Sequence, residues 1–94
     1  MINAIIFLTE LLATFLFISS ILISGGQPLV IGAALALLVY ISAPISGGSL
    51  NPAVSIASYM SGKIFMSEFL IYMFAQLLGG VGAALAYKYV YRTA

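Results

Sequence analysis

The sequence predicts an all-α integral membrane protein, with three transmembrane helices and one re-entrant half-helix in a single domain. Composition is the first observation: 64% of the 94 residues are hydrophobic, only 5% are charged, and the mean hydropathy is +1.24. A soluble domain of this size needs far less apolar surface, so the surrounding solvent is expected to be lipid. The second observation is that the apolar residues gather in three runs long enough to span a bilayer. The third is a polar, glycine-rich interruption that leads into a fourth, shorter apolar run.

The first two runs predict transmembrane helices at residues 4–24 and 28–45. Glu10 lies in the middle of the first span, where a carboxylate is expected to be functional or structurally indispensable. Gly32 and its neighbouring alanines predict a small-residue face for close helix packing in the second span. Pro44 disfavours a helical conformation at the residue before it, so regular helix is expected to fail there.

The interruption predicts a half-helix at residues 51–61. Gly48 permits a tight turn, Asn51 suits the N-cap, and Pro52 suits the first helical position, where no N–H is needed. Ala53 then opens the short apolar run. At 1.5 Å per residue this helix is roughly 15 Å long, about half of a hydrocarbon core, so it enters a membrane without crossing it.

The third span is predicted at residues 65–90. Gly79 and Ala83 are four residues apart and predict a second close-packing seam. Gln76 lies on the same helix as a polar side chain at membrane depth. Tyrosines and basic residues near the end of this span predict an anchor at the membrane interface.

This architecture requires further protein around it. The loop before Asn51 is irregular backbone at membrane depth, which is tolerated only when it is buried in protein or lines a water-filled cavity. The half-helix also leaves the opposite leaflet unfilled, and an inverted copy with its own half-helix would fill that gap. The sequence therefore predicts a second half-repeat as a partner within the lipid bilayer.

The stretch Ile45-Ser46-Gly47-Gly48 followed by Leu50-Asn51-Pro52-Ala53-Val54 resembles the first signature loop of the aquaporin, or major intrinsic protein, family. Glu10 with Thr14, Gly32 at nineteen residues before Asn51, and the run from Tyr72 through Gln76 to Gly79 continue the resemblance over essentially the whole chain. That family has two such repeats in one chain, and this sequence resembles the first alone. The resemblance therefore implies one half of an inverted-repeat channel fold.

The resemblance also implies roles for individual residues. Asn51 would cap the half-helix through its oxygen and turn its NH2 group to a lumen, while Glu10 and Gln76 would brace the loop. The remaining pore-lining or filter candidates are Gly48, Ser49, Ile31 and Val54.

Three positions depart from the family in ways that affect selectivity. Ser49 stands where many members have histidine, and Ile31 where the family places an aromatic residue of the outer filter. Val54 follows Ala53, whereas an arginine follows the motif of the family's second repeat. The expected pore is wider and more apolar than a strict water channel, and it would pass water and small neutral solutes such as glycerol.

Several alternatives remain open at this stage. The second half could be an antiparallel copy of the same chain, and such pairs could assemble into a tetramer of pores. It could also be a separate subunit. A third alternative is that the sequence is a gene fragment. A small dual-topology proton-coupled transporter would use Glu10 as its proton site, and a holin-like structural protein would conduct nothing. The transporter leaves the Asn-Pro-Ala half-helix without a purpose, and the holin-like protein gives no reason for Asn51, Gln76 and Glu10 to lie at their positions.

Composition excludes several other classes. Cysteine and histidine are absent, so disulfides and Cys/His metal sites are excluded, and no constellation for enzymatic catalysis is present. No cofactor is expected. A net charge of +1 gives no reason to expect nucleic acid as a partner. No basic residue precedes the first apolar run, so a cleaved signal peptide is not expected, and the predicted location is multi-pass in a plasma or inner membrane.

Overall fold

A computed structural model describes residues 3–92 as a set of helices joined by short connections. The α-helices are α1 (Asn3–Ser24), α2 (Pro28–Ser46), α3 (Pro52–Met60) and α4 (Met66–Ala86), and a short π-helix, η1 (Tyr87–Tyr91), continues α4. No strand occurs in the described part of the chain. Three segments, α1, α2 and α4 with η1, are long and apolar enough to cross a membrane. The predicted all-α membrane fold is therefore confirmed.

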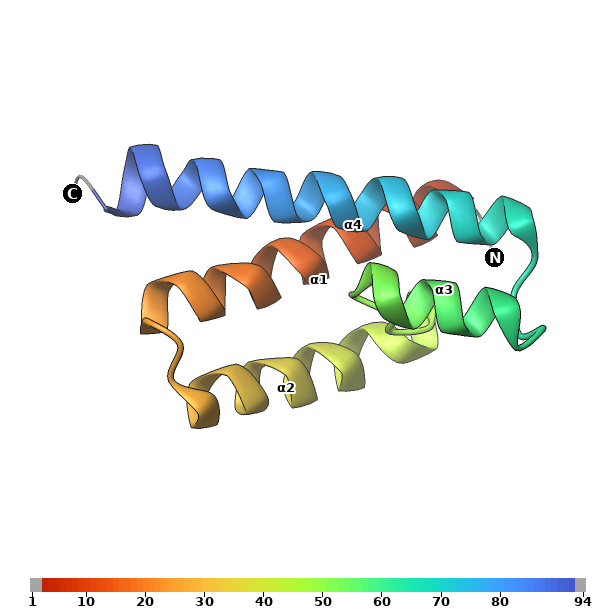
Figure 1. The fold of residues 1–94 in the computed structure, drawn as a ribbon, viewed down its shortest axis with the longest axis horizontal. Coiled ribbons are helices and arrows are strands. Elements are labelled where there is room, and N and C mark those ends of the chain that lie inside the picture. Colours follow the sequence, from red (N-terminus) through yellow and green to blue (C-terminus); the bar gives the residue numbers. More distant parts are fainter. Residues whose placement is uncertain (1–2, 93–94) are drawn as a thin grey trace.

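The long helices run side by side, and the short helix α3 lies alongside one end of them (Figure 1). Helix α1 packs against both α2 and α4, and α3 packs against α4. At the end of α2 the chain turns back toward the middle of the molecule, and α3 then leads outward again to the same end (Figure 1). This path is that of a re-entrant segment.

Pro44 does not end the second helix, contrary to the prediction. Helix α2 continues through Pro44 to Ser46, and Gly47, with φ 99°, caps it by donating its N–H to the carbonyl of Ala43. Proline cannot donate the backbone bond that residue 44 would otherwise make to the carbonyl of Tyr40, so the helix includes Pro44 at the cost of one hydrogen bond in its last turn. The irregular backbone is consequently shorter than predicted and begins at Gly47.

The interior of the helix set is unusually polar, whereas its outer surface is apolar. The buried polar residues are Glu10, Thr14, Ser42, Ser46, Ser55 and Gln76, and the buried apolar ones are Ile6, Ala13, Leu50, Tyr72, Ala75 and Ala83. Large apolar side chains such as Leu29 and Tyr40 are more than 80% exposed. Each described buried side-chain nitrogen or oxygen has a hydrogen-bond partner. This distribution suits a protein surrounded by lipid, because lipid gives buried polar groups no alternative partner.

Helices α1 and α4 approach each other closely at Gly79. A Cβ atom at this position would lie 2.8 Å from the carbonyl oxygen of Leu11 and 3.0 Å from Cβ of Thr14. Ala83, one turn later, is fully buried. Only a residue without a side chain allows this approach.

Gly32 makes no close packing contact within the described chain. A Cβ atom there would have no described atom within 4 Å, so within the described chain this face of α2 is open. Ser42, farther along α2, is buried and lines a hollow together with Thr9 and Ala13 of α1. Small residues permit close packing, but which face of a helix is covered depends on the neighbouring helices.

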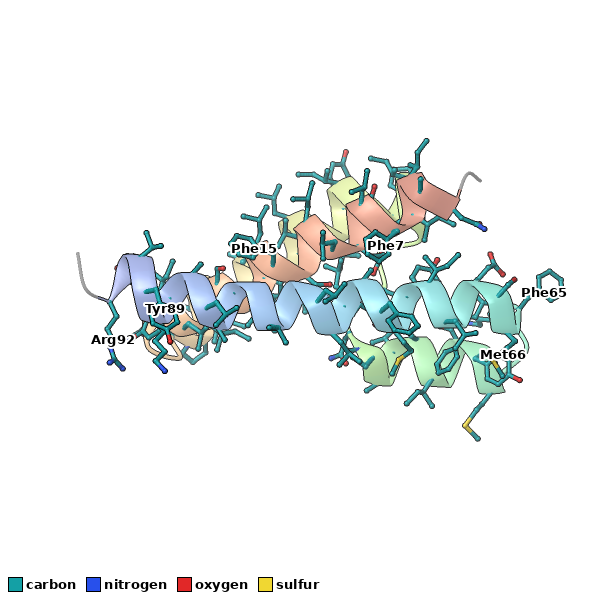
Figure 2. All side chains as sticks on the ribbon, turned by 90° about the horizontal axis from the view of Figure 1, so that it is seen from above. Phe7, Phe15, Phe65, Met66, Tyr89 and Arg92 are labelled. Atoms are coloured by element: carbon teal, nitrogen blue, oxygen red, sulfur yellow. The ribbon has the colours of Figure 1, made fainter. Side chains whose placement is uncertain are left out.

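The third span also differs from one uninterrupted α-helix, because its last five residues form η1. The rings of Tyr87 and Tyr91 stack there with centroids 5.9 Å apart. Figure 2 shows Phe65 and Met66 at one end of this span and Tyr89 and Arg92 at the other. Aromatic and basic residues at the two ends are typical of a segment anchored at both membrane interfaces.

Candidate functional site

The loop between α2 and α3 is a tight turn built from left-handed residues. Gly47, Gly48 and Leu50 have φ values of 99°, 64° and 57°. A Cβ atom on Gly48 would lie 3.2 Å from Cα of Ala43, so the loop folds closely back on the last turn of α2. Leu50 adopts this conformation despite its side chain, which is 1% exposed. Because such a conformation is unfavourable for leucine, the surrounding contacts must hold it.

Glu10 makes one of these contacts and also holds three neighbouring groups. Its Oε1 accepts hydrogen bonds from the backbone N–H of Leu50 at 2.8 Å and from Nε2 of Gln76 at 3.0 Å. Its Oε2 accepts from Oγ of Ser46 at 2.6 Å and from the backbone N–H of Ser49 at 3.2 Å. The side chain is fully buried. Four donors converge on one carboxylate, so α1 fixes the end of α2, the loop and α4 at a single point.

The polar network continues from Gln76 into α3. Oγ of Ser55 donates to Oε1 of Gln76 at 3.0 Å, and it lies 2.7 Å from Oγ of Ser49. Ser55 and Gln76 are buried, whereas Ser49 is half-buried. The loop is thereby attached to the first turn of α3 as well as to α1.

Two further bonds hold the loop backbone. The hydroxyl of Tyr72 donates to the carbonyl oxygen of Ser46, and Oγ1 of Thr14 donates to that of Leu50 at 3.4 Å. Sequence reasoning did not identify Ser46, Ser55 or Tyr72 as site residues. The sequence shows that each of these polar groups lies in an otherwise apolar segment. It does not show which of the polar groups form hydrogen bonds with one another.

Asn51 forms the N-cap of α3 with an extended backbone, φ −152° and ψ 128°. Its Oδ1 accepts from the N–H of Ala53 at 2.8 Å, and its carbonyl accepts from the N–H of Ser55 at 3.0 Å. The side chain is exposed, and with its oxygen occupied the NH2 group is the part that can bind a ligand. Pro52 occupies the first helical position, where its missing N–H is not needed.

Open space adjoins the start of α3 on two sides. One hollow of about 370 Å³ has Leu50, Asn51, Pro52 and Gln76 among its lining residues. Another of about 460 Å³ is lined by residues of α3 and by the connection that follows it, among them Ala53 and Val54. Val54 is 46% exposed. The Asn-Pro-Ala segment thus borders unfilled space within this chain.

The structure does not bring Ile31 to this site. Ile31 lies in the first turn of α2 and is half-buried, whereas the loop follows the other end of that helix (Figure 1). Fifteen residues of helix separate it from Ser46, or about 22 Å at 1.5 Å per residue. If Ile31 has a role in selection, it acts at a separate point along the molecule.

Acidic residues do not gather into a metal site. Within residues 3–92, no group of three or more His, Cys, Asp or Glu side chains could hold a metal ion. Glu68 lies at the start of α4, where its Oε1 accepts from the N–H of Phe65 at 2.9 Å. Its contact is that of a helix cap.

Comparisons with known proteins agree on one family. The family described as Major intrinsic protein matches residues 3–94. A glycerol uptake facilitator protein-like 6 from Lactiplantibacillus plantarum is 34% identical over 90 residues, covering 87% of this chain and 42% of the relative. Aquaporin TIP1-2 from Zea mays is 49% identical over 57 residues (58% of this chain, 22% of the relative), and aquaporin A from Dictyostelium discoideum is 42% identical over 60 residues (64% and 21%). No solved structure matches the chain significantly.

The chain spans less than half of the length of the curated relatives that it matches. Its length therefore corresponds to only part of each of those proteins.

Proposed function

Since this chain belongs to the major intrinsic protein family, we propose that it forms half of a channel for passive transport of water and small neutral solutes such as glycerol. The observation that carries the proposal is Asn51 at the start of a re-entrant half-helix, with its oxygen occupied by the cap and its NH2 group free. A free donor beside open space can orient a passing hydroxyl group or water molecule. The N-terminus of α3 adds about half a positive charge at the same point, which disfavours cations.

The contacts of Glu10 favour a bracing role over proton coupling. A proton-coupled transporter needs its carboxylate to exchange protons with water during the transport cycle. Glu10 is fully buried, and each of its oxygens accepts two hydrogen bonds from the loop and its neighbours. Releasing it would leave several buried donors without a partner, so the same carboxylate is poorly suited to cycling.

Residue types along the proposed pore favour small neutral solutes as well as water. Ser49 is smaller than the histidine that many members of the family have at this position. Val54 is more apolar than the filter arginine that follows the motif of the family's second repeat. The L. plantarum relative is named as a glycerol uptake facilitator-like protein, which agrees with a glycerol-permeable channel. The sequence therefore supports a mixed selectivity for water and small polyols.

A second copy of this chain in the opposite orientation is the proposed other half. Helices α2 and α3 carry exposed apolar side chains, among them Leu37, Tyr40 and Ile56, and the half-helix leaves the opposite leaflet to be filled. Basic residues lie on both sides of the proposed membrane, Lys63 on one and Lys88 and Arg92 on the other, so the positive-inside rule gives no clear orientation. Such pairs could further assemble into a tetramer of pores.

The test is reconstitution of the purified chain in liposomes, followed by osmotic shrinkage in sucrose and then in glycerol. Rapid water loss in sucrose, with re-swelling in glycerol, is the expected result. Flux only after a second subunit is added would instead indicate a separate partner. Protein that is folded but supports no flux, alone or with a partner, would overturn the channel proposal.

A further inference from the structure

The hydrogen bonds around Glu10 form a chain whose direction can be deduced. The chain passes from Glu10 to Gln76, from Gln76 to Ser55, and from Ser55 to Ser49. Its first three members are at most 2% exposed, whereas Ser49 is half-buried. Ser49 is therefore the end of the chain that reaches the molecular surface.

Each bond fixes the direction of the next. A carboxylate that already accepts from Ser46, Ser49 and Leu50 presents only acceptors, so Gln76 must turn its NH2 group toward Glu10. The oxygen of Gln76 then faces Ser55, whose single hydroxyl hydrogen is donated to it at 3.0 Å. Ser55 has no second hydrogen, so in the 2.7 Å contact between the two serines Ser49 must be the donor.

We infer that Ser49 is a specificity-determining residue that offers permeating solutes an acceptor only, with Ser55 as the residue that positions it. The hydroxyl hydrogen of Ser49 is held inside the protein, and its oxygen retains a free lone pair. Asn51, two residues later, supplies the donor that Ser49 lacks, because its oxygen accepts from the N–H of Ala53 and its NH2 group turns away from that cap. An acceptor and a donor at neighbouring positions suit a solute whose hydroxyl groups both donate and accept, which is the chemistry of small polyols.

This inference rests on the proposed function, and one experiment separates the two. The wild type, Ser49→Ala, Ser55→Ala and the double variant are reconstituted in liposomes, and the ratio of glycerol to water permeability is measured for each. Ser20→Ala is the matched control, because the Ser20 hydroxyl bonds to the carbonyl of Phe17 within its own helix. Circular dichroism and size-exclusion profiles establish that each variant is folded.

Ser49→Ala is expected to lower the glycerol-to-water ratio by about threefold to tenfold, the change that one net hydrogen bond produces. Ser55→Ala is expected to lower the same ratio, because Ser49 loses the partner that orients it. The double variant should match Ser49→Ala alone, since Ser55 acts through Ser49. Ser20→Ala should match the wild type.

Two results would overturn the inference while leaving the channel intact: a wild-type ratio in Ser49→Ala, or additive effects in the double variant. If Ser55→Ala does not fold, Ser55→Cys replaces it, because a thiol fills the site with a slightly larger group that is a weaker donor and acceptor. Absence of water flux from folded wild-type protein would overturn the channel proposal, and this inference with it.

Discussion

The carboxylate of Glu10 accepts a 2.8 Å hydrogen bond from the backbone N–H of Leu50, which lies forty residues later in the chain. Leu50 has a φ of 57°, and this left-handed conformation costs a non-glycine residue about 1–2 kcal/mol. Leu50 directly precedes Asn51, so its conformation decides where the half-helix begins and where the Asn51 side chain lies. The position of a proposed pore residue in α3 therefore depends on a side chain of α1.

Replacing Glu10 with glutamine is expected to destabilise the fold severely. In the wild type each carboxylate oxygen of Glu10 accepts from two donors. Glutamine has an NH2 group in place of one of these oxygens, so two donors would face another donor. Each buried group left without a partner costs about 1–3 kcal/mol, so we expect a loss of at least about 2 kcal/mol in the free energy of unfolding. Unfolding in mixed detergent micelles, followed by circular dichroism, measures it.

Glu68→Gln provides the matched control for this variant, since Glu68 caps α4 with a single bond to Phe65. We expect its effect to stay below about 1 kcal/mol. A Glu10→Gln protein that is as stable as the wild type, but has lost solute uptake driven by a pH gradient, would contradict the bracing role and support a proton-coupled transporter.

The sequence was sufficient to predict the helices, because each carries a local signal. Long apolar runs indicate spans, and Asn51 followed by Pro52 indicates the start of a half-helix wherever it occurs. The convergence of Glu10 and Gln76 on the loop, by contrast, was inferred from the family resemblance. Neither composition nor spacing could have indicated which donors each carboxylate oxygen accepts.

The parts that could not be predicted depend on contacts between distant segments. Gly32 and Gly79 carry the same local signal for close packing, yet Gly79 lies against α1 and Gly32 faces open space within the described chain. Ser55 was not distinguished from the other serines, because its role arises only when α3 lies beside Gln76. Pro44 was read as a helix end, although the helix includes it one turn before its cap.

Adjacent glycines of α4 allow a test of the α1–α4 contact. A Cβ atom at Gly79 would lie 2.8 Å from a backbone oxygen of α1, whereas a Cβ atom at Gly80 would have no described atom within 4 Å. Gly79→Ala is therefore expected to separate the helices and to lower the free energy of unfolding by about 1–3 kcal/mol. Gly80→Ala should be neutral or stabilising by about 1 kcal/mol, because alanine favours helix more than glycine does.

Denaturation of both variants in the same detergent measures the difference between them. Equal stabilities for Gly79→Ala and Gly80→Ala would show that α1 and α4 do not pack as described.

Alanine usually gives a more stable protein than glycine, but at residue 50 we expect this order of stability to be reversed. Both Leu50→Ala and Leu50→Gly remove a side chain that is 1% exposed, so both should lose about 2–5 kcal/mol of stability. Alanine also retains the unfavourable left-handed conformation, which glycine adopts freely. The glycine variant should therefore be at least as stable as the alanine variant, which thermal unfolding of the two proteins in detergent would establish. A clearly more stable alanine variant would mean that residue 50 does not have a positive φ.

Asn51→Asp is expected to keep the half-helix but to change what the pore admits. Aspartate caps a helix as well as asparagine does, so the bond to the N–H of Ala53 can be retained. The variant loses the NH2 donors and places a negative charge beside the hollow that Asn51 lines, and acidic side chains in a pore attract cations. Water flux should fall by about threefold to tenfold, the change expected for one lost hydrogen bond, while proton or cation leak rises.

Stopped-flow light scattering measures the water flux in liposomes, and a trapped pH-sensitive dye measures the leak. Gln27→Glu is the matched control, because it makes the same amide-to-carboxylate change at the exposed N-cap of α2, in a connection apart from the loop. It should leave both rates at the wild-type level. If Asn51→Asp is folded and its water flux and leak equal those of the wild type, Asn51 does not face the conducting path, and the cap is its whole role.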